Sequence, residues 1–118
     1  MDKTCLQQLK RGTMEMLFLS LIENHAFYGS EIMAILNEEG APYFAGTKEG
    51  SVYPVFYRLE DEGFIQSIPV GKQKKTFQIT EKGRKRLAEL EETWSGFVVK
   101  VNELMQRGEN DRCRWTTL

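Results

Sequence analysis

The chain has 118 residues, of which 41% are hydrophobic and 28% are charged, and its formal net charge is −1. These values are typical of one globular domain with a buried core, and they argue against disorder and against nucleic-acid binding through net charge alone. The apolar runs are too short to span a bilayer and the first residues do not form a signal peptide, so we expect a cytoplasmic protein.

The first half of the sequence predicts three helices. Apolar residues recur every three or four positions in residues 4–24, which indicates a first helix that Gly12 interrupts. After a break, the same spacing predicts a second helix at residues 29–39. Thr47 is the expected N-cap of a third helix, and Gly63 ends that helix.

Two strands joined by a basic turn follow the third helix. Residues 64–70 and 76–79 are the expected strands, and in the second of them Phe77 and Ile79 alternate with polar residues. Between the strands, residues 71–75 carry three lysines beside a glycine. The order of three helices, a hairpin and a last helix predicts a mainly α fold with a two-stranded β-wing, the winged helix-turn-helix, followed by a long C-terminal helix.

The last helix is the longest of the predicted elements. Thr80 is its expected N-cap and it runs over residues 81–107, which leaves residues 1–80 as the winged helix-turn-helix and residues 108–118 as a flexible tail. Its apolar residues alternate at spacings of three and four, which forms a heptad seam. This helix would be about 40 Å long, and the rest of so small a chain cannot cover its whole apolar seam, so we expect a homodimer. The alternative is that the seam packs on the first helix of the same chain. The expected interface residues are Leu87, Leu90, Trp94, Phe97, Val98, Val101 and Leu104.

Charge is distributed unevenly although the net charge is small. Residues 66–86 hold seven basic residues and one acid, Glu81, and such a patch can neutralise phosphates, although a solvated surface hairpin is the alternative. The exposed face of the third helix carries hydroxyl groups and an arginine, which is suited to bidentate contact with guanine. For Arg11 and Ser30, an ordinary exposed helix position is an equal alternative, and for Tyr53 and Tyr57 the alternative is a half-buried place in the core. We therefore expect double-stranded DNA as partner, with contacts from Arg11, Ser30, Ser51, Tyr53, Tyr57, Arg58, Lys72, Lys74 and Lys75.

The tryptophan of the seam suggests a site for a small molecule. A large ring at a two-fold interface leaves flat apolar walls, between which a hydrophobic or aromatic compound can bind, although simple dimer packing is the alternative. The candidate effector pocket consists of Leu9, Gly12, Met16, Trp94, Phe97 and Val98.

No constellation in the sequence predicts catalysis. His25 is the single histidine and has no evident nucleophile beside it, and Cys5 and Cys113 lack metal-ligand spacing. We therefore expect no enzyme, no metal and no cofactor.

Several motifs resemble the PadR family of bacterial transcriptional regulators. They are Lys10-Arg11-Gly12-Thr13-Met14, Tyr28-Gly29-Ser30-Glu31-Ile32, Gly50-Ser51-Val52-Tyr53-Pro54 through Gly63-Phe64-Ile65, Phe77-Gln78-Ile79-Thr80-Glu81-Lys82-Gly83, and Trp94 at the family's spacing. The resemblance implies a homodimeric repressor that places its third helix in the major groove and its wing near the minor groove, on a pseudo-palindromic operator. Some members with a tryptophan like Trp94 bind flat hydrophobic drugs between the subunits.

The sequence departs from the family pattern at three places. Ser30 stands where the family commonly has tyrosine, and the wing carries lysines where arginines are frequent. Val98 is not an acid, so a neutral or anionic effector is expected in preference to a cationic one. The competing functions are another kind of winged-helix ligand sensor and a winged helix that serves as a protein-interaction module.

Overall fold

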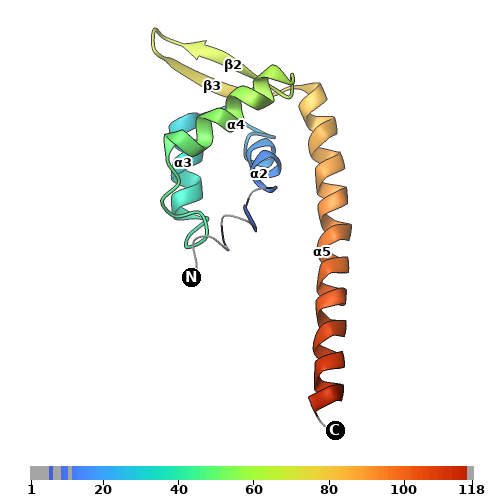
Figure 1. The fold of residues 1–118 in the computed structure, drawn as a ribbon. Helices are drawn as coiled ribbons and strands as arrows, with labels where there is room; N and C mark the ends of the chain where they lie inside the picture. The colour runs from blue at the N-terminus through green and yellow to red at the C-terminus, as the bar shows by residue number, and fades with distance from the viewer. Residues whose placement is uncertain (1–5, 7–8, 11, 117–118) are drawn as a thin grey trace. The chain divides into compact units, whose positions relative to one another are not determined.

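The computed structural model describes residues 6, 9–10 and 12–116 of the chain. Its elements are shown in Figure 1 and are α2 (Met14–Leu21), β1 (Phe27–Tyr28), α3 (Gly29–Glu38), α4 (Glu49–Asp61), β2 (Ile65–Val70), β3 (Lys74–Ile79) and α5 (Glu81–Thr116). The chain divides into two units, residues 1–87 and residues 88–118, so α5 begins in the first unit and its continuation is the second. Among the described helices, none carries an apolar stretch of the length that a bilayer crossing requires.

The core of the first unit is made of apolar side chains from every helix and from the sheet. Phe56 of α4 lies at its centre, where its ring stacks on Phe77 with centroids 4.2 Å apart and meets Phe18 at 5.0 Å. Burial of each such side chain stabilises the fold by about 1.5–3 kcal/mol. The fully or nearly fully buried apolar residues are Phe18, Leu19, Ile22, Ile32, Leu36, Val52, Phe56, Leu59, Ile65, Phe77, Ile79 and Leu87.

The sheet has three antiparallel strands in the order β1-β3-β2. β2 and β3 form the expected wing, with Ile65 opposite Ile79 at its base, and the hairpin reaches beyond α4 in Figure 1. β1 was expected to be part of a break between helices, but it pairs with β3 through Phe27 opposite Phe77. Two residues are too few to show a period of alternation, so only the pairing itself reveals this strand.

Three boundaries differ from the sequence predictions. The first helix was expected to pass through Gly12, but α2 begins at Met14 because the chain turns first, with both the amide and the hydroxyl of Thr13 donating to the Lys10 carbonyl at 2.9 Å. Lys74 and Lys75 belong to β3 and not to the turn. α5 continues beyond Arg107 to Thr116, since a single glycine costs a helix only about 1 kcal/mol.

The two predicted N-caps have different outcomes. Thr80 is confirmed, because its hydroxyl accepts a hydrogen bond of 3.0 Å from the amide of Gly83. Thr47 does not cap α4; Lys48 is the N-cap, and the Thr47 hydroxyl donates to the Phe44 carbonyl at 2.5 Å.

Candidate nucleic-acid interface

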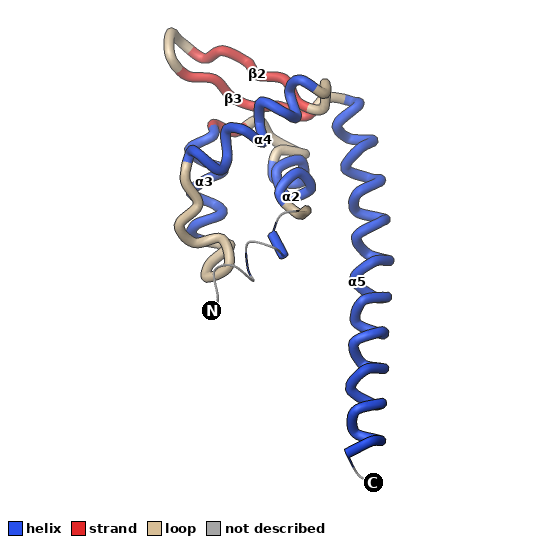
Figure 2. Tube along the Cα trace, in the orientation of Figure 1, coloured by secondary structure: helices blue, strands red, loops and turns tan. Residues whose placement is uncertain are grey.

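The N-terminal end of α4 is held by one amide side chain. Asn37 of α3 donates from Nδ2 to the Met33 carbonyl at 2.8 Å and to the Thr47 carbonyl at 3.0 Å. Its Oδ1 accepts from the Gly46 amide at 2.6 Å. The bond to Met33 lies within α3 and orients the side chain, whereas the bonds to Thr47 and Gly46 close the loop between α3 and α4, which is tan in Figure 2. They fix the place where α4 starts relative to α3.

The C-terminal end of α4 is held by the turn that leads into the wing. Gly63 has φ +81°, a left-handed conformation that glycine adopts without strain, and its carbonyl accepts from the Thr80 hydroxyl at 2.7 Å. Glu60 accepts a hydrogen bond of 3.0 Å from the Ser67 amide of β2. Helix and wing are thereby joined at the wing's base.

The face of α4 opposite the core is exposed and polar. Ser51, Tyr57 and Arg58 lie on this face, as expected, whereas Val52 is fully buried. The guanidinium group of Arg58 makes no hydrogen bond or ion pair with any residue in the described part of the chain. Its five N–H donors are therefore available to an external acceptor.

Tyr53 differs from its expected place away from the apolar face. It is half-buried, and its ring meets Phe56 at 5.9 Å and Phe77 at 6.4 Å. A methyl group added at Gly29 would lie 2.7 Å from the Tyr53 hydroxyl oxygen. Tyr53 therefore packs α4 against the start of α3, because an aromatic ring at the border of the apolar face gains more from burial than from exposure.

The three expected wing lysines have different surroundings. Lys72 lies in the turn between the strands and is exposed, and Lys74 is exposed on β3 with its ammonium 6.0 Å from the centre of the Tyr28 ring. Lys75 is half-buried, with its ammonium 5.2 Å from the centre of the Tyr57 ring. Of these three lysines, Lys72 and Lys74 are therefore the exposed ones.

The remaining expected DNA contacts lie outside α4 and the wing. Ser30 is exposed in the first turn of α3, where the amide of Tyr28 donates to Glu31 at 2.8 Å. An exposed serine at the positive end of a helix can donate to a phosphate. Arg11 lies outside the described residues.

The expected dimer residues divide between the two units. Leu87, which was expected at the dimer interface, is 2% exposed in the core of the first unit, so it packs within its own chain. In the second unit, Trp94 is 44% exposed and both Phe97 and Leu104 are 61% exposed. Leu90, Val98 and Val101 are half-buried. An exposed apolar row of this kind is typical of a helix that pairs with a partner.

The expected effector residues also come from both units. Trp94, Phe97 and Val98 belong to the second unit. In the first unit, Leu9 is 72% exposed, Gly12 is exposed and Met16 is half-buried.

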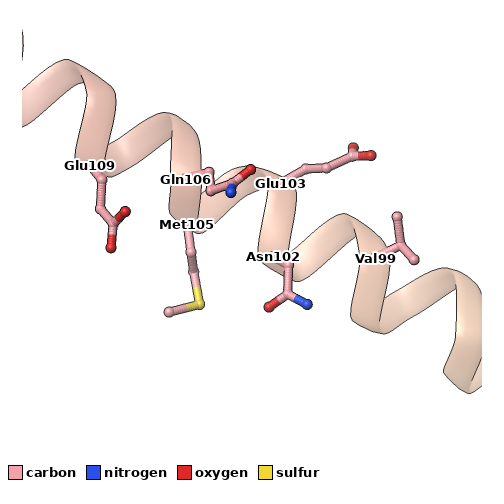
Figure 3. Close-up of a pocket in the computed structure, with 6 residues that line it drawn as sticks. All are labelled: Val99, Asn102, Glu103, Met105, Gln106 and Glu109. Carbon is pink, nitrogen blue, oxygen red and sulfur yellow. The ribbon is translucent and has the colours of Figure 1, made fainter.

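A different hollow lies on the surface of α5. It encloses about 480 Å³ and is bordered by one helix alone, as Figure 3 shows, with Val99, Asn102, Glu103, Met105, Gln106 and Glu109 around it. All six lining residues belong to α5, so they do not supply the opposing wall that a small-molecule site needs. In the part of the chain that the structure describes, no three His, Cys, Asp or Glu side chains gather where they could hold a metal ion.

Sequence reasoning missed two positions that support the interface. Asn37 could have been recognised from the sequence, because it is a polar residue directly after Leu36, on the inward side of α3. Gly29 has none, because the need for glycine there arises from Tyr53, 24 positions away along the chain.

This chain is similar in sequence and structure to known proteins. The sequence model of the transcriptional regulator PadR-like family matches residues 18–89. A PadR-like transcriptional regulator from Bacillus cereus shares 31% sequence identity, with a TM-score of 0.74, and the match covers 84% of this chain and 97% of that one. A PadR family regulator from Eggerthella lenta shares 28% identity, with a TM-score of 0.76 and coverage of 86% and 89%. No curated protein matches this chain.

One similar structure contains DNA. Bacillus subtilis PadR in complex with operator DNA shares 28% identity and has a TM-score of 0.56. The match covers 64% of this chain and 45% of that protein.

Proposed function

This chain belongs to the transcriptional regulator PadR-like family, and we propose that it is a homodimeric repressor that binds a pseudo-palindromic operator. DNA-binding transcriptional regulation, and not enzymatic catalysis, is the function of this family. Repression needs no further activity, because a dimer that occupies a promoter excludes the polymerase sterically.

One observation carries the DNA-binding geometry: α4 is fixed at both ends while its outer face, with the unpaired Arg58, is open. An α-helix fits the major groove, which is about 12 Å wide, and arginine discriminates guanine through two hydrogen bonds. The wing starts where α4 ends, so a helix in the major groove brings Lys72 and Lys74 to the neighbouring phosphates. The positive ends of these lysines supply affinity without reading sequence.

The exposed apolar row of α5 supports the dimer. Trp94, Phe97 and Leu104 are large apolar side chains that lie exposed along one helix, and contiguous exposed apolar residues mark interaction surfaces. A second copy buries the same row through a two-fold axis, because identical seams are complementary to each other. Two linked copies of α4 then reach two half-sites about 34 Å apart on one face of the duplex.

Removal of the two free wing lysines should weaken DNA binding without regard to sequence. Lys72→Ala combined with Lys74→Ala removes two phosphate contacts, so the slope of log K against log salt should decrease by about 1.8. Titration of a fluorescent duplex at several salt concentrations measures this slope. A double variant with the slope and affinity of the unmodified protein would remove the wing from the interface.

Arg58→Ala is the matched comparison for the wing variant. It removes a group that reads bases, so it should cost about 1–3 kcal/mol on the preferred duplex and much less on a duplex of unrelated sequence. Equal losses on both duplexes would mean that Arg58 contacts only phosphates.

An effector of the repressor is proposed to bind at the exposed ring of Trp94. A planar, apolar, neutral or anionic compound between two copies would contact Trp94, Phe97 and Val98, and it should quench Trp94 fluorescence. Trp115→Phe removes the second tryptophan signal. Linkage of this kind is typically worth 1–3 kcal/mol, so a saturating compound should weaken operator binding by about 5- to 150-fold. Binding that persists unchanged in Trp94→Ala would exclude this site.

A further inference from the structure

Lys75 lies on the opposite side of the sheet from Lys74, its neighbour on β3. Side chains alternate along a strand, so Lys75 shares the face of Phe77 and Ile79, both buried, whereas Lys74 points to the opposite face. Lys75 is half-buried, and Lys72 and Lys74 are exposed. Its side chain therefore extends between the sheet and α4, and not away from the wing.

The ammonium group of Lys75 is held over two aromatic rings. It lies 5.2 Å from the centre of the Tyr57 ring and 5.6 Å from the centre of the Phe77 ring. Both distances are within the range of a cation–π interaction. Among the described residues, no hydrogen bond or ion pair of Lys75 competes with these contacts. The two rings are thus the structural partners of its charge.

Tyr57 is the residue of α4 that this contact reaches. It is 48% exposed on the outer face of α4, and its ring lies 6.1 Å from that of Tyr53, tilted by 41°. Lys75 lies over the same ring from the wing. When the hydroxyl of an exposed tyrosine binds a partner, the side chain loses conformational entropy, which weakens binding. A ring that is already confined in the free protein loses less entropy, so binding is stronger.

We propose that Lys75 is a positioning residue that holds the Tyr57 hydroxyl in place for DNA and couples the wing to α4, and that it is not a phosphate contact. This inference rests on the proposed DNA-binding role of α4. It changes the expected role of Lys75, because a lysine that neutralises a phosphate would have to leave both rings. Lys74, its neighbour on the same strand, is exposed and lies over one ring, that of Tyr28, at the longer distance of 6.0 Å, so it is the lysine of β3 that can make the phosphate contact.

The contact itself can be measured in the free protein, independently of DNA. Protons above the face of an aromatic ring are shielded, so NMR should find the ε-methylene protons of Lys75 upfield of those of Lys72. Tyr57→Leu should move the Lys75 signal toward that of Lys72, with the remaining shift due to Phe77. Equal signals for the two lysines in the unmodified protein would show that the contact is absent and would overturn the proposal.

The role in recognition is tested with two duplexes, one selected by the unmodified protein from a randomised pool and one of unrelated sequence. Lys75→Met keeps the length of the side chain but removes the charge, and it should weaken binding to the selected duplex by about 5-fold with an unchanged salt slope. Lys75→Arg keeps a cation over the rings and should restore the affinity. The matched control, Lys74→Met, should decrease the salt slope by about 0.9 on both duplexes.

A double variant decides whether Lys75 acts through Tyr57. In the Tyr57→Leu background, Lys75→Met should cause no further loss of affinity for the selected duplex, because the two residues work as a pair. A loss that persists in this background, or a salt slope that decreases as it does for Lys74→Met, would make Lys75 a phosphate contact and overturn the proposal. An unmodified protein that does not prefer the selected duplex would instead contradict the proposed function, and the NMR result would stand separately.

Discussion

Val101→Glu is expected to convert the protein to a monomer and to abolish operator binding. Val101 lies half-buried in the apolar row of α5, between the exposed Phe97 and Leu104. In a two-fold dimer the substitution places two carboxylates in one desolvated seam, and an unpaired buried charge costs several kcal/mol. Sedimentation at micromolar concentration should then detect a single species of 13.7 kDa.

Val99→Glu is the matched control for this prediction. Val99 is on the same helix and is 54% exposed, but its direction differs from that of Val101 by about 160° around the helix axis. Val99→Glu should therefore remain a dimer and bind the operator normally. If Val101→Glu sediments as a dimer, or if both variants dissociate equally, the row does not form the interface.

Gly83→Ala is expected to destabilise the first unit by more than about 2 kcal/mol. A Cβ at this position would overlap the carbonyl oxygen of Phe64 and would approach Cγ1 of Ile79 to 2.8 Å. The Phe64 carbonyl cannot easily retreat, because it accepts a hydrogen bond of 3.1 Å from the Thr80 amide. The resulting overlap outweighs the gain of about 1 kcal/mol that alanine brings to a helix.

Urea denaturation of Gly83→Ala measures this loss, and Gly108→Ala in the same helix is its control. At Gly108 an added Cβ meets nothing within 4 Å, so alanine should leave the free energy of unfolding unchanged or raise it by up to about 1 kcal/mol. If Gly83→Ala is as stable as the unmodified protein, then α5 does not start against Phe64 as described.

The helices and the wing were predictable because their signals are local. Spacings of three and four residues marked α3 and α4, and the alternation of Phe77 and Ile79 marked β3. The exposed face of α4 followed from the same period, which placed Arg58 opposite the buried Val52 and Phe56. Thr80 was identified as a cap because its hydroxyl acts within three residues.

The features that the sequence did not reveal depend on contacts between distant segments. β1 exists because β3 offers it an edge, and Tyr53 is half-buried because Gly29 leaves room for its hydroxyl. Lys74 and Lys75 have identical side chains. The pairing of β3 alone decides which of these lysines lies on the side of α4. Leu87 belongs to the core of the first unit although it continues the heptad pattern. The sequence could not reveal this, because a heptad repeat shows which residues are buried and not which partner buries them.

If α4 reads base sequence and two copies bind one operator, binding should depend both on the sequence of the duplex and on the presence of two half-sites. The most direct test measures the affinity and stoichiometry of the unmodified protein on the selected duplex, on that duplex with one half-site scrambled, and on an unrelated duplex, all at the same salt concentration. We predict two chains on each selected duplex, with an affinity at least about 10³-fold above that for the unrelated duplex and a large loss on the scrambled half-site. Equal affinity for all three duplexes would show that α4 does not read base sequence. Binding by one chain at a time, with no penalty for the scrambled half-site, would show that two copies do not bind one operator.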